Sequence, residues 1–307
     1  MGKILLYYKY VTIDRPERIV AEQRALCEQL SLKGRIFVAQ EGINGTIGGT
    51  VEHTERYKEL MKQHVLFHDM DIKESEGSAD HFPKLKVLVK KEIVKLGIDP
   101  SVISAKDAGV HLSPEEAHAL LAENPDDLIV IDARNAYESA IGSFKNAIKP
   151  TINYFRELPS FIDANPELFK NKRVLMFCTG GVRCERASAY LKTKEVAQEV
   201  YQIKGGIHRY VEAFPNGFFR GKNYVFDGRI AQKVTDDIQA SCKHCAVAYD
   251  DYSNCINAEC NKQIVICPNC NTFYNTTCST ACKELVHGGY VKVRVIPHKL
   301  QPETNQA

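Results

Sequence analysis

Over the first hundred positions, short runs of alternating apolar and polar residues are separated by two longer stretches with helical spacing. In the first helical stretch Asp14 is the predicted cap, and Pro16 stands in the first turn. The Gly- and Asn-rich segment EGINGT is expected to join two short strands within 34–50. The predicted elements are strand 3–10, helix 14–32, the two strands within 34–50, helix 51–64, a strand near 70–74 and a strand in the basic stretch that starts at Leu85. This βαββαβ order with an extra strand predicts a ferredoxin-like α+β domain over residues 1–100.

From Ser113 onward, short apolar strands alternate with helices. The run Ser113-Pro114-Glu115-Glu116 is typical of a helix start, and three apolar runs then end at Asp132, at Cys178 and at Gly205-Gly206. Such alternation predicts an α/β domain, here over residues 101–216, with a parallel sheet that is covered on both faces. Ligands of such sheets bind at the carboxyl ends of the strands, so these three strand ends mark the expected site.

The segment VLMFCTGGVRCERASAYL (174–191) places Cys178 between a strand and the start of a helix. The unpaired N–H groups and partial positive charge of a helix start, together with Arg183 and Arg186, are expected to lower the pKa of this thiol and make it a nucleophile. Gly180 and Gly181 allow the loop to turn its N–H groups inward as an anion-binding nest. The predicted active-site loop is Cys178, Thr179, Gly180, Gly181, Val182 and Arg183.

The length of this loop separates two chemistries. Phosphatases of related architecture use Cys-x5-Arg, whereas Cys178 and Arg183 are spaced as Cys-x4-Arg, and a cysteine stands at position 184. The shorter loop argues against a phosphatase. Cys184 is either a resolving thiol for Cys178 or a small residue on the buried side of the helix, and the sequence leaves both interpretations open.

The last segment, predicted as a linker and a small module over 217–307, contains eight of the eleven cysteines. They form four pairs at short spacing, which is the number of thiolates that two tetrahedral zinc sites require. We expect metal rather than disulfides because the N-terminal segment lacks the pattern of a secretory signal, and a reducing cytoplasm favours thiolates. Whether the first pair shares a site with the second or with the third is left open. The predicted ligands are Cys242, Cys245, Cys255, Cys260, Cys267, Cys270, Cys278 and Cys282.

Composition changes this picture only locally. The 307 residues are 44% apolar and 25% charged, with a net charge of +2, so there is no global case for binding nucleic acid or membrane. No window approaches the roughly 18–20 apolar residues of a membrane helix, and we expect a cytoplasmic protein. Alternation would expose several lysines of one segment together, either as a phosphate-binding patch for RNA or as the guarded edge of a sheet. These are Lys84, Lys86, Lys90, Lys91 and Lys95.

Several motifs resemble known proteins. IDARNAYESAIGSFKNAI (131–148), CTGGVR and IKGGIHRY resemble the signature motifs of a rhodanese domain, whose loop cysteine carries a persulfide. By this resemblance Asp132 and Arg134 lie beside the mouth of the site, and we expect Arg186 to support it as well. Ser143 and Tyr210 depart from the His and Trp that are common at these places. With GRIFVAQEGINGTIGG, FFRGKNYVFDGR and the cysteine-rich tail, nearly the whole chain resembles the bacterial tRNA uridine hydroxylase family.

That resemblance implies oxygen-dependent conversion of the wobble uridine of tRNA to 5-hydroxyuridine, with Cys178 as the required cysteine. Molecular oxygen would be the co-substrate and tRNA the partner, and the sequence carries no flavin, haem or nicotinamide motif. Two other hypotheses stay open: a sulfurtransferase that carries a persulfide on Cys178, and a non-catalytic module that binds RNA or senses redox state. The loop alone favours sulfur transfer, and the surrounding motifs favour RNA hydroxylation.

Overall fold

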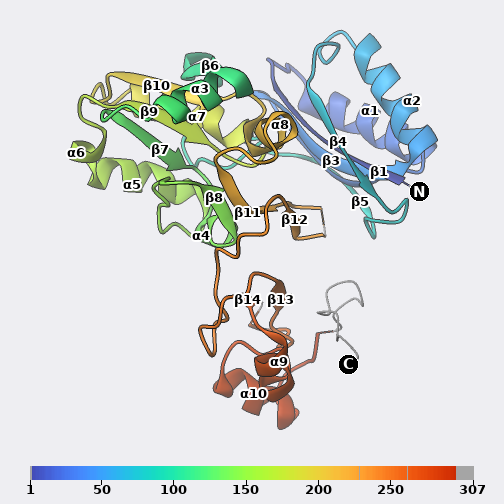
Figure 1. Ribbon diagram of the computed structural model, residues 1–307. Helices are drawn as coiled ribbons and strands as arrows, with labels where there is room; N and C mark the ends of the chain where they lie inside the picture. The colour runs from blue at the N-terminus through green and yellow to red at the C-terminus, as the bar shows by residue number, and fades with distance from the viewer. Residues whose placement is uncertain (1, 228, 261, 295–307) are drawn as a thin grey trace. The chain divides into compact units, whose positions relative to one another are not determined.

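A computed structural model describes residues 2–227, 229–260 and 262–294 of the chain (Figure 1). The chain divides into two compact units. The first unit comprises Met1–Ala136, Asn146–Phe218 and Phe226–Gly228, and the second comprises Tyr137–Lys145, Phe219–Val225 and Arg229–Ala307. The first unit holds the N-terminal and central sheets, and the second holds the cysteine-rich segment. The domain boundaries that we expect near 100 and 216 stay predictions.

The N-terminal sheet has five strands in the order β4-β1-β3-β2-β5. Its first four strands pair antiparallel, and β5 lies parallel to β2 at the edge. Helices α1 and α2 cover one face, where Leu5 and Tyr7 of β1 pack with Cys27 of α1 and with Tyr57 of α2 (Figure 1). The elements are β1 Gly2–Tyr10, α1 Pro16–Gln29, β2 Lys33–Ala39, β3 Gly42–Thr50, α2 Val51–Gln63, β4 Ile72–Gly77 and β5 Leu85–Val89. The predicted ferredoxin-like α+β fold with an added strand is confirmed.

Two local predictions in this sheet are wrong. Helix α1 begins at Pro16 with Arg15 at the cap position and no side-chain cap bond, so Asp14 does not cap it. The segment EGINGT is not a connection, because the turn lies before Gly42 and the rest of the segment belongs to β3. Its glycines make room inside the sheet: a Cβ on Gly45 would lie 2.4 Å from the ring of Tyr7. The glycines of this segment therefore serve close packing within the sheet.

The central sheet has four parallel strands in the order β6-β10-β9-β7. Ser113 caps α3 in a capping box with Glu116, as predicted. α5 and α7 contribute to one core cluster that also contains Val174 and Met176 of β9. The elements are η1 Ala105–Asp107, β6 Val110–Leu112, α3 Pro114–Glu123, β7 Leu128–Asp132, η2 Phe155–Glu157, α5 Leu158–Ala164, α6 Pro166–Phe169, β9 Arg173–Phe177, α7 Val182–Lys192, β10 Glu199–Ile203 and α8 Gly206–Ala213. The predicted α/β domain with a parallel sheet is confirmed.

The second unit is built from short elements. Strand β11 pairs antiparallel with β8 and β12, and β13 pairs antiparallel with β14. Phe219 of β11 lies opposite Phe144 of β8, so the chain between β7 and η2 supplies a strand to this unit. The remaining elements of the chain are α4 Ala136–Ser139, β8 Gly142–Phe144, β11 Phe219–Tyr224, β12 Ala231–Lys233, β13 Tyr252–Asn254, β14 Gln263–Val265, α9 Pro268–Tyr274 and α10 Thr280–His287.

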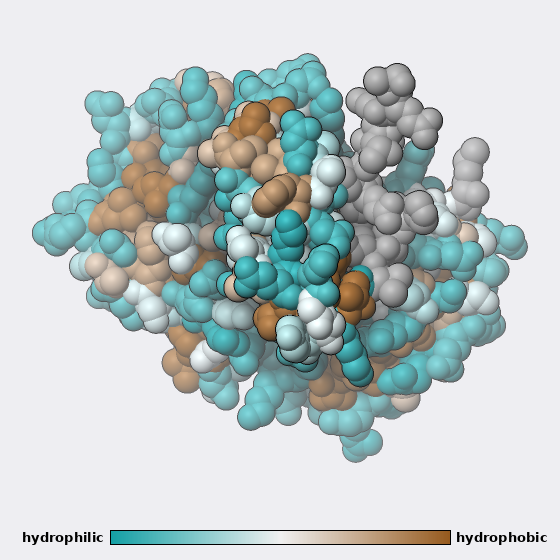
Figure 2. Space-filling model, turned by 90° about the horizontal axis from the view of Figure 1, so that it is seen from below, coloured by the Kyte–Doolittle hydropathy of each residue, from teal (hydrophilic) through white to brown (hydrophobic). Residues whose placement is uncertain are grey.

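The described helices are too short or too polar to cross a membrane. Among these residues no helix combines the length and apolar character needed to cross a bilayer. On the face drawn in Figure 2, hydrophobic residues lie in small groups that hydrophilic residues separate.

Candidate active site

Cys178 lies between the end of β9 and the start of α7, as predicted. Its side chain is fully buried, and the backbone N–H of Gly181 donates a hydrogen bond to its Sγ atom at 3.2 Å. Gly181 has a φ of 104°, a conformation that favours glycine and turns this N–H group toward the sulfur. The predicted nest of backbone donors is therefore formed around the thiol.

The environment of Cys178 favours its thiolate. Burial by itself raises the pKa of this thiol, but a hydrogen bond from Cys184, the positive charge of Arg183 and the N–H groups of Arg183 and Cys184 outweigh it and lower the pKa to about 5. Cys178 is therefore a thiolate at neutral pH and becomes protonated as the pH falls through about 5.

Cys184 is the thiol partner of this thiolate. It is fully buried, and burial together with the neighbouring Cys178 raises its pKa well above the usual range, so it stays protonated and donates its hydrogen bond. The structure thus brings the two cysteines together. Both interpretations of Cys184 are compatible with this contact, and its role as a resolving thiol stays a prediction.

The start of α8 holds the loop from the other side. The N–H groups of Ile207 and His208 donate to the carbonyl oxygens of Cys178 and Thr179 at 3.0 and 3.1 Å. Gly206 makes this approach possible, because a Cβ there would lie 2.4 Å from the Cys178 carbonyl oxygen and its φ is 64°. The glycines of IKGGIHRY therefore serve backbone packing against the thiol loop.

Replacing Gly206 with alanine tests this contact. We expect a loss of about 2–4 kcal/mol in the free energy of unfolding, since left-handed strain and backbone overlap add. Gly97→Ala is the matched control, because Gly97 also has a positive φ of 85° but would meet only the Cβ of Arg156, at 3.3 Å. Urea unfolding of both variants measures the difference, and equal losses would show that the contact with the loop carries no energy.

Asp132 and Arg134 form a buried pair beside the loop. The Arg134 Nε and Nη2 atoms donate to the two carboxylate oxygens of Asp132 at 2.8 and 2.6 Å, and both side chains are fully buried. The Ala133 N–H donates to the Phe177 carbonyl oxygen at 2.9 Å, and the Arg134 guanidinium lies 5.8 Å from the Phe177 ring centroid. This pair therefore packs against the residue that precedes Cys178, and its role in the site stays a prediction.

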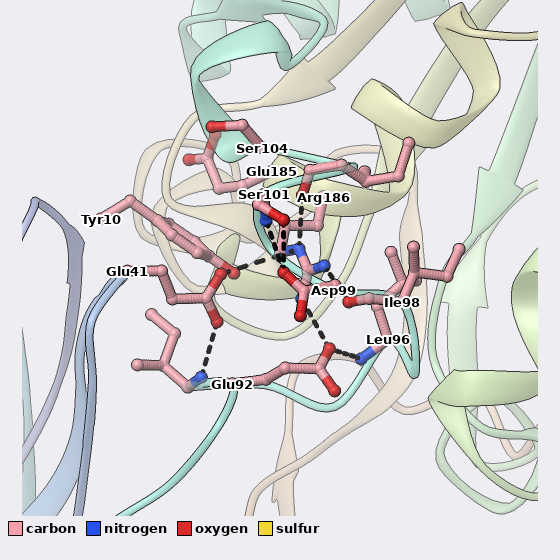
Figure 3. Close-up of polar contacts among 12 residues, drawn as sticks. Tyr10, Glu41, Glu92, Leu96, Ile98, Asp99, Ser101, Ser104, Glu185 and Arg186 are labelled. Carbon is pink, nitrogen blue, oxygen red and sulfur yellow. Dashed lines mark hydrogen bonds and ion pairs between the residues drawn. The ribbon is translucent and has the colours of Figure 1, made fainter.

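Arg186 supports helix α7 through contacts with the linker of residues 90–104, which joins β5 to η1 (Figure 3). Its guanidinium donates to Glu92 Oε2 at 2.5 Å and to the carbonyl oxygens of Ile98 and Ile103 at 2.5 and 3.0 Å. Its Nε atom also lies 3.7 Å from Glu41 Oε2. Arg186 thus joins α7 to the linker and to the turn between β2 and β3, and this contact accounts for a fully buried guanidinium.

The sequence did not indicate that the N-terminal sheet contributes to this site. The Tyr8 hydroxyl donates to Glu185 Oε1 at 2.9 Å, and the Tyr10 hydroxyl donates to the carbonyl oxygen of Val182 at 3.2 Å. Both tyrosines alternate with Tyr7, which faces the helices, so the period of two in YYKY was the available signal. Lys73 of β4 is also buried there, with 1% of its surface exposed, and a lysine in a short polar strand gives no signal of burial.

The eight clustered cysteines form two compact sets that could each hold a metal ion. The sulfur atoms of each set lie within 4.8 Å of one another, and the Sγ–Sγ distances of Cys245–Cys267, Cys260–Cys278 and Cys278–Cys282 are 3.5–3.6 Å. Such distances suit a tetrahedron around zinc, where Zn–S bonds of about 2.3 Å place sulfurs nearly 4 Å apart, and they are too long for disulfides. The sets are Cys242, Cys245, Cys267 and Cys270, and Cys255, Cys260, Cys278 and Cys282. The pairing that the sequence left open is therefore interleaved.

The five predicted lysines lie on the described surface of the N-terminal sheet and linker. All are exposed, and Lys86 stands in β5, the edge strand. On the face away from the helices, Arg35 of β2 lies opposite Lys86, and the cations of Arg35 and Lys90 lie 5.8 and 5.2 Å from the ring centroid of Phe37. The lysines thus border a surface where cations surround an aromatic ring.

Comparison with known proteins places the chain in a family. Three family models match it in succession: a UPF0176 acylphosphatase like domain at residues 2–93, a rhodanese-like domain at 113–213 and a rhodanase C-terminal region at 220–283. Proteins named tRNA uridine(34) hydroxylase from Corynebacterium jeikeium, Staphylococcus saprophyticus and Shouchella clausii are each 42% identical to it. These alignments cover 87%, 94% and 99% of this chain and 89%, 92% and 94% of the relatives. With such identity over nearly the full length of both partners, this chain belongs to the tRNA uridine(34) hydroxylase family, as its motifs predicted.

Proposed function

We propose that this protein hydroxylates uridine 34 of tRNA to 5-hydroxyuridine, with molecular oxygen as co-substrate and Cys178 as the reacting nucleophile. One observation carries the assignment of the nucleophile: a fully buried thiol whose pKa is lowered to about 5 by a thiol donor, an arginine and backbone N–H groups. A thiolate, unlike a thiol, attacks electrophilic centres at neutral pH. Its tRNA substrate implies a protein of the cytoplasm.

The other residues of the site prepare this nucleophile. Cys184 and Arg183 stabilise the negative charge on Sγ. Asp132 and Arg134 pack beside the end of β9, and Arg186 fixes α7, so these three act on the position of the loop. The same thiolate would suit a sulfurtransferase with a persulfide on Cys178, but family membership favours hydroxylation over that activity and over a non-catalytic module.

The experiment that tests the proposed function compares tRNA nucleosides by mass spectrometry. Cells that lack this protein, cells that express it and cells that express Cys178→Ala supply the tRNA. Unchanged 5-hydroxyuridine and derived nucleosides in all three would refute the proposal. Transfer of sulfur from thiosulfate to cyanide at ordinary enzymatic rates, lost in Cys178→Ala, would instead favour the sulfurtransferase.

We also propose that both cysteine sets bind structural zinc. All eleven cysteines of the chain are free thiols, and four thiolates close a tetrahedral zinc site without a position for substrate. The core cluster of this segment consists largely of those cysteines, with Ile264 and Ile266 as its buried aliphatic residues. Metal ligation would therefore supply much of its folding free energy.

The basic surface around Phe37 is the proposed contact for tRNA. Lys86 and Arg35 supply phosphate-binding charges, and the Phe37 ring, which is half-buried, offers a face on which an unpaired base can stack. We expect Lys86→Ala combined with Lys90→Ala to weaken tRNA binding by about tenfold and to reduce its salt dependence. Lys170→Ala with Lys172→Ala is the control in the central domain, where Lys170 is exposed and Lys172 is half-buried. Filter binding at several salt concentrations measures both, and equal affinities for the two variants would contradict this assignment.

A further inference from the structure

The face of the N-terminal sheet that α1 and α2 do not cover packs directly on the thiol loop. Leu6 and Lys73 are neighbours across β1 and β4, and Tyr8 stands on the same face of β1 as Leu6. A Cβ on Gly180 would meet Leu6 at 3.3 Å, one on Gly181 would meet the Tyr8 hydroxyl at 2.6 Å, and one on Gly205 would meet Lys73 Cε at 3.4 Å. The side chains of Leu6, Tyr8 and Lys73 therefore lie against the three glycines of the thiol loop and of the start of α8.

Lys73 brings a positive charge into this contact. Its side chain is 1% exposed, and its ammonium lies 5.5 Å from the centroid of the Tyr8 ring. A buried ammonium is costly unless an anion compensates it. Its carboxylate partner is Asp71, whose Oδ2 atom lies 2.8 Å away, and Asp71 also pairs with Arg209 of α8. Two cations therefore share one carboxylate at the edge of the loop.

We infer that Lys73 is a positioning residue of the active site, whose buried ammonium stabilises the thiolate of Cys178 and ties the N-terminal sheet to the loop. This inference rests on the proposed role of Cys178 as the nucleophile. It is supported by the pKa of Lys73, which burial lowers below its usual value while the negative charges of Asp71 and Cys178 partly offset this effect. By reciprocity, the same interaction stabilises the thiolate.

Other charged and titratable groups lie near this sulfur or near Lys73, and they set the size of the expected effect. They are Arg183, Cys184 and Glu185 of α7, Tyr8 and Tyr10 of β1, and, beyond Lys73, Asp71 and Arg209. Cys184 and Arg183 contribute most of the side-chain stabilisation of the Cys178 thiolate. Loss of the Lys73 charge should therefore raise the pKa of Cys178 by only about half a unit to one unit. That corresponds to roughly a three- to tenfold smaller thiolate fraction at a pH below the pKa.

The test is the pH dependence of Cys178 alkylation by iodoacetamide in the full-length protein, read by mass spectrometry at this residue. Lys73→Met is expected to move the midpoint upward, and Lys73→Arg should restore it because it keeps the charge. Lys58→Met is the control, since Lys58 pairs with Glu55 on the helix-covered side of the same sheet. An unchanged midpoint in folded Lys73→Met would overturn the inference.

A second measurement does not depend on the folding of the Lys73 variants. Cys178→Ser removes the thiolate, so the midpoint for acetylation of the Lys73 amine should shift to lower pH in this variant, while that of Lys58 stays constant. No shift at Lys73 would overturn the inference as well. Both readouts are independent of tRNA hydroxylation: if the protein does not modify tRNA while both midpoints move, the proposed function fails and the coupling of Lys73 to Cys178 stands.

Discussion

Cys178→Ala is expected to abolish formation of 5-hydroxyuridine, with a loss of roughly a thousandfold or more in rate, because it removes the reacting atom rather than a contact to it. The fold should persist, since the change deletes one buried sulfur atom and keeps the backbone hydrogen bonds that Ile207 and His208 make to the loop. The measurement is the amount of 5-hydroxyuridine and derived nucleosides in tRNA from cells that express only the variant.

Substitutions of two further cysteines belong in the same assay, Cys27 as a control and Cys184 as a test of its role. Cys27 is fully buried in the N-terminal core, so Cys27→Ala creates a similar small cavity without touching the loop and should retain activity. Cys184→Ala tests the interpretation of that residue as a resolving thiol against the donor role that the structure shows. It removes the thiol donor and should raise the pKa of Cys178, so activity that recovers at higher pH indicates a donor, whereas loss at every pH indicates a resolving thiol. Hydroxylation that survives Cys178→Ala would exclude this thiol as the nucleophile.

The thiol loop was predictable because local sequence determines it. An apolar strand that ends in a cysteine, two glycines and a helix start specify the backbone, and the structure places Cys178 and the N–H of Gly181 accordingly. One of the two wrong predictions, that of EGINGT, concerns residues whose role depends on distant strands. The glycines of EGINGT lie inside β3, where they accommodate Tyr7, and only the sheet reveals this contact.

Contacts between the N-terminal sheet and the thiol loop could not be predicted from the sequence for the same reason. A strand pattern assigns Tyr8 and Lys73 to the face opposite the helices, but it does not say what covers that face. Arg186 was expected to act on the site, and the structure shows that its contacts run through Glu92 and the linker carbonyl groups. Pairing of distant residues is fixed by tertiary packing, and one sequence carries no record of it.

The grouping of the cysteines into interleaved sets is likewise set by tertiary packing, and a decisive experiment can test it. Spacing alone allows sequential or interleaved sites, whereas the structure groups Cys242 with Cys267 and Cys255 with Cys278. We expect the purified protein to contain two zinc ions per chain. Serine substitution of Cys242 together with Cys267 should remove one ion, because both belong to one set. Substitution of Cys242 together with Cys255 should remove both, because each set loses a ligand.

The two double variants carry equal numbers of substitutions, so elemental analysis of zinc per chain compares them directly. Sequential sites would give the opposite result, with one ion lost when Cys242 and Cys255 are changed and two lost when Cys242 and Cys267 are changed. Because structural zinc contributes about 10 kcal/mol or more to small cysteine-ligated modules, we expect each lost ion to expose residues 242–282 to proteolysis. Cleavage there should leave the first unit intact, since its cores at β1 and at β9 contain none of these cysteines. Protein purified without chelators that holds no zinc, yet resists protease across this segment, would contradict a structural role for the metal.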